Sequence, residues 1–135
     1  MTKNKNKELR DKILEALSLR RKLTRTICEY LSMLIANKGE NADIVLPRID
    51  YYIHKLDECL DEIPFSSEDK LDKAFTKSKL NNVKTHLISV MANAVIGEFG
   101  SSAESFEYMF EELFGIRDTL LEELQRVVLD DESNS

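Results

Sequence analysis

Glycine and proline are scarce in this chain, which has four glycines and two prolines among 135 residues. All six lie between residues 39 and 64 or between residues 97 and 115, so the stretches 2–38 and 65–96 contain none. These two residue types most often interrupt regular structure, and apolar residues recur at helical spacing in both stretches. The chain is therefore predicted to be almost entirely helical.

Long apolar runs are also lacking. The most apolar segment, residues 87–97, contains Ser89 and Asn93, and a membrane-spanning helix needs roughly 20 apolar residues. We therefore expect no membrane partner and predict that this segment is a helix buried nearly all round. The basic start of the chain leads into charged residues and not into an apolar segment, so no secretory signal is predicted.

Cysteine occurs only twice, as Cys28 and Cys59, and neither belongs to a CxxC pair. This usage favours a reduced, cytoplasmic setting and predicts neither a metal nor a cofactor. Both cysteines have isoleucine or leucine near them in the sequence, so we predict that both are small core residues at helix contacts. His86 is expected to be a hydrogen-bonded residue at the edge of the core.

The remaining pattern predicts an all-α, antiparallel four-helix bundle with one long N-terminal helix. The helices are expected at about residues 7–37, from Pro47 to Ile63, from Ser66 or Ser67 to near Gly97, and from the capping-box sequence at residues 101–104 onward. A break at Gly115 would divide the last helix and give five segments. Aromatic residues around the last junction are predicted to close the core: Phe99, Phe106, Tyr108, Phe110 and Phe114.

Residues 1–129 are predicted to form this single domain, and residues 130–135 an acidic, disordered tail. The first expected helix is nearly twice as long as the second. Its overhang must pair with a later helix or with another subunit. The mismatch favours a homo-oligomer or a complex with another protein.

Charge alternates along the chain. Residues 1–38 hold ten basic and four acidic residues, and residues 39–69 hold two and nine. Residues 70–93 hold five and one, and residues 94–135 hold two and eleven. In an up-and-down bundle each basic helix would lie beside acidic ones, which favours one topology.

The same charges suggest surfaces for recognition. The densest basic cluster lies in the middle of the first helix, where side chains one turn apart could bind an acidic partner together. The preferred hypothesis is a non-enzymatic interaction or regulatory protein that uses this cluster and an opposite acidic pole. The basic residues are Arg20, Arg21, Lys22 and Arg25, and the acidic residues are Glu107, Glu111, Glu112 and Glu122.

Nucleic-acid binding through the basic cluster is the alternative hypothesis. The chain as a whole carries a net charge of −6, which would repel a polyanion unless the acidic helices face away. No aromatic residue interleaves with the cluster to stack on bases. Nucleic acid is therefore a possible partner but a less favoured one.

Carboxylates crowd the segment on both sides of Pro64. They are Asp57, Glu58, Asp61 and Glu62 before the proline, and Glu68, Asp69 and Asp72 after it. Acids three residues apart share a helix face, and oxygen ligands suit Mg²⁺. Residues 57–72 resemble the all-α nucleoside triphosphate pyrophosphohydrolases, which pair a Glu-Glu-x-x-Glu helix with a Glu-x-x-Asp helix. The resemblance implies Mg²⁺-dependent nucleotide hydrolysis as a further alternative.

A second enzyme-like pattern is Arg48 followed by His54 in a small helical chain. This pair resembles the HEPN ribonucleases. The resemblance implies that the histidine would transfer protons and the arginine would stabilise phosphate charge. However, six residues span about 240° around a helix, so the two side chains are not expected to share a face.

Overall fold

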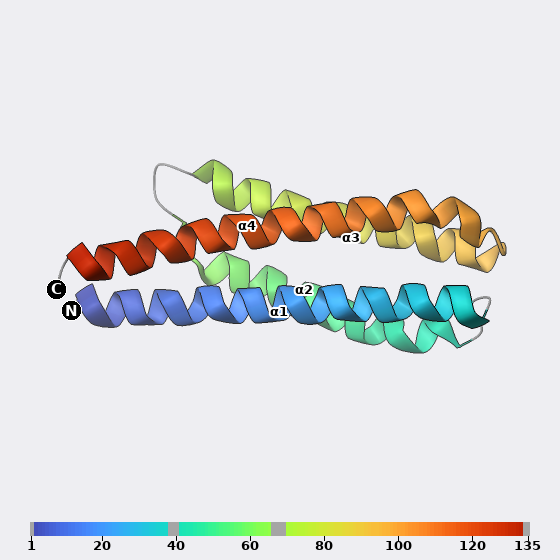
Figure 1. The fold of residues 1–135 in the computed structure, drawn as a ribbon, viewed down its shortest axis with the longest axis horizontal. Helices are drawn as coiled ribbons and strands as arrows, with labels where there is room; N and C mark the ends of the chain where they lie inside the picture. The colour runs from blue at the N-terminus through green and yellow to red at the C-terminus, as the bar shows by residue number, and fades with distance from the viewer. Residues whose placement is uncertain (1, 38–40, 66–69, 134–135) are drawn as a thin grey trace.

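The computed structural model describes residues 2–37, 41–65 and 70–133. Within these residues the chain forms four helices and no strand, as the sequence predicts (Figure 1). The helices are α1 (Thr2–Asn37), α2 (Leu46–Glu62), α3 (Lys70–Val95) and α4 (Ala103–Ser133). Two short 3-10 turns, η1 (Ala42–Val45) and η2 (Phe99–Ser102), precede α2 and α4.

The four helices form an antiparallel bundle in which α1 packs against α2 and α4, and α3 packs mainly against α4. The contact between α2 and α3 is the loosest of the four sides. The register of α1 and α4 is fixed at both ends. Asn6 donates hydrogen bonds to Asp130 and Asp131, whereas the Tyr30 ring lies 6.3 Å from the Phe106 ring. A residue near the start of α1 is therefore level with one near the end of α4.

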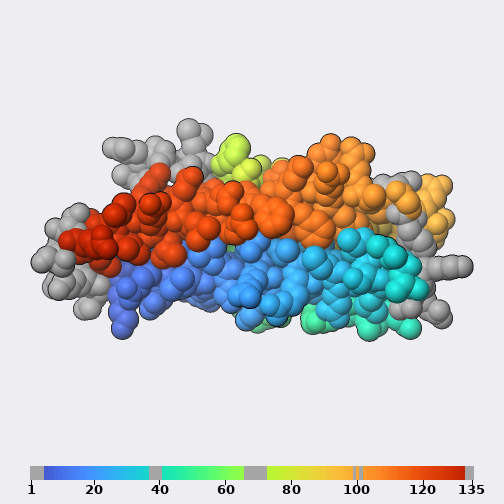
Figure 2. All heavy atoms as spheres, in the orientation of Figure 1, coloured from blue at the N-terminus to red at the C-terminus, as the bar shows by residue number. Residues whose placement is uncertain are grey.

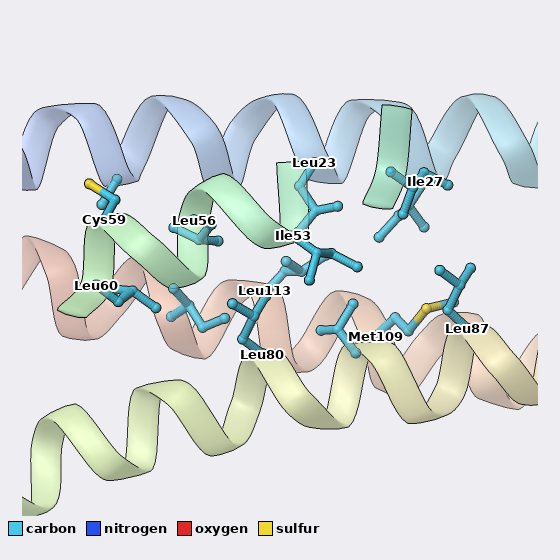
Figure 3. Close-up of a cluster of buried hydrophobic side chains, with 14 of the residues drawn as sticks. Leu23, Ile27, Ile53, Leu56, Cys59, Leu60, Leu80, Leu87, Met109 and Leu113 are labelled. Carbon is cyan, nitrogen blue, oxygen red and sulfur yellow. The ribbon is translucent and has the colours of Figure 1, made fainter. Parts of the chain in front are cut away.

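Each helix contributes one stripe of apolar side chains to the core. Side chains from all four helices converge in the middle of the bundle (Figure 3), including Leu23 of α1, Leu56 of α2, Leu80 of α3 and Leu113 of α4. Each of these is at most 1% exposed. Complete burial of such a side chain stabilises the fold by about 1.5–3 kcal/mol. The spacing of three and four residues in the sequence thus sets which face of each helix is buried.

The helix ends follow local chemistry. Pro47 lies in the first turn of α2, where its missing N–H costs nothing. Gly97 follows α3 with φ at 77°, in the left-handed region that glycine adopts without strain. In contrast, α4 runs without a break through Gly115. The predicted cap at Ser66 or Ser67 lies outside the described residues.

Two helix boundaries and one burial pattern differ from expectation. α1 begins at Thr2 instead of Lys7, and α4 continues to Ser133, where the sequence predicts a disordered tail from residue 130. The segment after Leu87 is not buried all round, because Ile88 is 66% and Val95 87% exposed. A helix in a four-helix bundle has neighbours on one side only, so its outer apolar residues face solvent.

The prediction for cysteine is confirmed for Cys59 and wrong for Cys28. Cys59 is buried, and its thiol donates to the Lys12 carbonyl oxygen at 3.4 Å. Burial raises the pKa of the Cys59 thiol to about 11. Cys28 follows the core residue Ile27 by one position, and this rotation of about 100° carries it to the outside of α1.

The overhang of α1 beyond α2 is covered within the chain. The last turns of α4 run beside the first turns of α1, where Asn6 binds Asp130 and Asp131. The unequal helix lengths therefore do not by themselves require a second subunit. In the part of the chain that is described, every helix is too short or too polar to cross a membrane.

Candidate interaction surface on the outer face of α1 and α4

Contacts to neighbouring helices define two flanks on α1. Lys12 pairs with Glu62, and Glu29 accepts a hydrogen bond from Arg48 at 2.9 Å, which identifies the flank that faces α2. The flank that faces α4 lies on the other side of the buried stripe. Leu14, Arg21 and Cys28 follow one another at seven-residue spacing on this second flank, and all three are exposed.

The flanks of α4 are defined in the same way. Gly115 lies against the Lys79 side chain, and the Tyr108 ring stacks on His86 of α3 with 5.2 Å between ring centroids. The flank that faces α1 lies on the opposite side of α4. It carries Phe114, Leu121 and Val128, which are again seven residues apart and 40–45% exposed.

The exposed positions of these two flanks form one continuous surface, which we call the α1/α4 face. Figure 2 shows α1 and α4 side by side along the whole length of this face. Leu14 on α1 and Leu121 on α4 are level with each other, and both are nearly half exposed. The Arg117 guanidinium lies 5.0 Å from the centre of the Phe114 ring. The face therefore presents apolar side chains along its middle.

A basic ridge, formed by Arg21 and Arg25, lies on the α1 side of this face, where Arg21 continues the row of Leu14 and Cys28. Lys22, seven residues before Glu29, lies toward the flank that faces α2. All three side chains are exposed, and none has a hydrogen bond or ion pair with any described residue. Some other cations are paired within the fold, as Lys12 is with Glu62 and Lys77 with Asp61. The ridge thus keeps its charge available to another molecule.

Arg20, which the sequence groups with this cluster, is buried and lies outside the ridge. It occupies a core position between Ala16 and Leu23 and is 9% exposed. Its Nη1 donates to the Thr24 hydroxyl at 3.2 Å, while its Nε has no hydrogen-bond partner. Burial, and then the nearby Arg117 guanidinium, lower the pKa of Arg20. Its role is structural.

The predicted acidic pole divides into two parts. Glu107 and Glu111 are exposed on the α1/α4 face and have no ion pair with a described residue, so we call them the acidic ridge. Glu122 is exposed on the side of α4 that faces α3. Glu112 is half-buried, and its Oε2 is shielded without a hydrogen-bond partner.

The carboxylates near Pro64 are engaged by lysine within the described residues. Lys77 Nζ lies 2.5 Å from Asp61 and 3.7 Å from Asp57, and this contact lowers the pKa of Asp61. Glu58 lies 3.6 Å from Lys55. No group of three metal-binding side chains occurs among the described residues. Asp69 and the side chain of Asp72 fall outside them.

Arg48 and His54 lie on different flanks of α2. Arg48 contacts Glu29 on the side that faces α1, and this hydrogen bond raises its pKa. His54 is exposed, with its Nδ1 3.2 Å from the backbone oxygen of Asp50. The two side chains do not converge on one phosphate-sized position, as their separation in the sequence predicts.

A groove lies between α2 and α3. This groove has a volume of about 500 Å³ and an apolar floor that includes Ile53 and Leu87. Asp50 and Lys84 stand at its rim. The groove is on the opposite side of the bundle from the α1/α4 face, so Lys84 is a useful control position for changes on that face.

Comparison with protein families, with curated proteins and with solved structures found no significant match. The sequence analysis identified the charged ridges but missed the apolar strip between them. The seven-residue spacing of Phe114, Leu121 and Val128, one position beyond the core residues of α4, is the signal that could have revealed it.

Proposed function

We propose that this protein is a non-enzymatic interaction or regulatory module that binds a protein partner through the α1/α4 face. The observation that carries the proposal is the arrangement of unpaired charge around exposed apolar side chains. Arg21 lies in the row of Leu14 on α1, Glu107 lies in the row of Phe114 and Leu121 on α4, and Arg25 and Glu111 are one turn away from them. An exposed apolar patch rimmed by charge is typical of a protein–protein interface.

The chemistry of the face defines the partner. Such a partner would present acidic residues to the basic ridge, basic residues to the acidic ridge, and apolar side chains to Leu14, Phe114 and Leu121. Burial of the apolar strip would supply most of the affinity. The two ridges of opposite sign would set orientation and speed the encounter. The proposal includes a reducing, cytoplasmic setting, which the free thiols of Cys28 and Cys59 support.

Nucleic acid fits this face less well than protein does. The basic ridge could contact phosphates, but Glu107 and Glu111 lie beside it on the same face. A polyanion that reached the ridge would also meet this negative charge and be repelled. Nucleic acid is therefore treated as one outcome of the test.

The test is affinity capture of the tagged full chain from a lysate of its native cells, with and without nuclease treatment. Wild type is compared with the R21E/R25E variant, and Lys84→Glu on the opposite side is the control. We expect wild type and the control to capture the same partner protein. The recovered amount should be at least tenfold higher than with the R21E/R25E variant. Equal recovery by all three would contradict the proposal. Loss of the captured material on nuclease treatment would favour nucleic acid.

A further inference from the structure

The α1/α4 face is complementary to itself. We propose that its partner is a second copy of this chain, bound around a two-fold axis parallel to the bundle. This inference rests on the proposed function, because it assigns a partner to the same face. A two-fold axis in this direction places α1 of one copy against α4 of the other and keeps every residue at its own level along the bundle.

The register within one chain determines which residues would meet. Asn6 is level with Asp130 and Tyr30 with Phe106, so Arg25 is level with Glu111 and Leu14 with Leu121. Across the proposed axis, Arg25 of each copy therefore faces Glu111 of the other. The same operation brings the two apolar strips together at Leu14 and Leu121.

Arg21 and Phe114 form a second complementary pair across the proposed axis. Phe114 is level with Arg21, and its ring already attracts the guanidinium of Arg117 at 5.0 Å. Across the axis Arg21 of one copy faces Phe114 of the other, and arginine over an aromatic ring is a favourable contact. Because the axis generates every contact twice, each pairing occurs at two places in the interface.

The alternative two-fold axis is disfavoured by charge. An axis perpendicular to the helices would place α1 against α1 and α4 against α4. If that axis passes at the level of the ridges, Arg25 would lie against Arg25 and Glu111 against Glu111 of the other copy. Like charges in contact are strongly unfavourable at an interface. The parallel axis instead brings Arg25 and Glu111 together at both contacts.

The size of the face is sufficient for a specific dimer. A face two helices wide, with each helix about 10 Å across and about 46 Å long for the 31 residues of α4, offers about 900 Å². Specific interfaces bury about 800 Å² on each partner.

The experiment uses two variants of the full chain with complementary charge reversals. One variant is R21E/R25E, and the other is E107K/E111K. In a dimer of either variant alone, residues 25 and 111 would carry like charges at both of the symmetry-related contacts. In a mixed dimer these two contacts would again join opposite charges. The mass of each sample is measured by light scattering after size exclusion, and circular dichroism verifies helicity.

We expect wild type to show twice the monomer mass of 15.6 kDa, each variant alone to show the monomer mass, and an equal mixture to recover the dimer. Because Cys28 lies on the face, its alkylation should be at least fivefold slower in the mixture than in either variant alone. A wild type that stays monomeric, or a mixture that fails to associate although both variants are helical, would overturn the inference.

These outcomes separate this inference from the proposed function. A monomeric wild type that still captures another protein through Arg21 and Arg25 would remove the second copy as the partner and keep the binding face. A dimer that forms equally well in the R21E/R25E variant would place the dimer contact elsewhere, and this would also overturn the inference.

Discussion

At the residue scale, Arg20 shows how one side chain can interrupt an otherwise apolar helix stripe without leaving the core. Its side chain is buried, and its guanidinium donates to the Thr24 hydroxyl. The Nε remains without a partner, and Arg117 places a second positive charge nearby. A buried donor without a partner carries a desolvation cost. We therefore expect Arg20 to be less favourable to the fold than an apolar side chain at the same position.

Replacement of Arg20 by methionine tests this interpretation. Methionine has a similar length and no charge, so we expect Arg20→Met to raise the free energy of unfolding by about 1 kcal/mol. The measurement is denaturant unfolding followed by circular dichroism at low protein concentration. The exposed Arg21→Met is the control and should change the free energy by less than about 0.5 kcal/mol. A loss of stability in Arg20→Met would show that the guanidinium is favourably paired.

At the element scale, two glycines with the same sequence signal have different roles. Gly97 ends α3 with a left-handed φ of 77°, whereas Gly115 lies inside the continuous helix α4. A Cβ at Gly115 would lie 3.1 Å from Cδ of Lys79, on a flexible side chain that can shift. The sequence could not distinguish the two positions, because the difference depends on the neighbouring helix and on the local φ.

Alanine substitutions at these two positions should have opposite effects. Gly115→Ala should raise the free energy of unfolding by up to about 1 kcal/mol, because alanine is the better helix former. Gly97→Ala should lower it by about 1 kcal/mol, because its φ is unfavourable for residues with a Cβ. Thermal unfolding of both variants beside wild type measures the difference. Destabilisation by Gly115→Ala would show that the close approach of α3 requires glycine.

The sequence predicted the helices and their buried stripes well because both depend on local spacing. It did not predict that Cys28, Ile88 and Val95 are exposed, because exposure depends on how many neighbours surround a helix. For the candidate site, the spacing of like charges identified the basic ridge. Whether Arg20 or Arg21 faces solvent depends on a rotation of 100°, which only the packed bundle fixes.

At the scale of the whole molecule, the alternating charge of the segments has two outcomes. Toward α2 the opposite charges meet within the chain, in the pairs Lys12–Glu62 and Lys77–Asp61. On the α1/α4 face Arg21, Arg25, Glu107 and Glu111 are exposed and have no ion pair with a described residue. The first set favours one topology of the bundle. The second set leaves a surface with two ridges of opposite sign, which water solvates in the free chain and which a complementary surface would pair.

The measurement that tests this account most directly is small-angle X-ray scattering of the full chain over a range of concentration. α1, with 36 residues, is about 54 Å long and sets the length of the molecule. Association through the α1/α4 face predicts that the scattering mass doubles while the maximum dimension stays near the length of one bundle. A dimer of about twice that length, or a mass that never exceeds the monomer, would contradict association through this face.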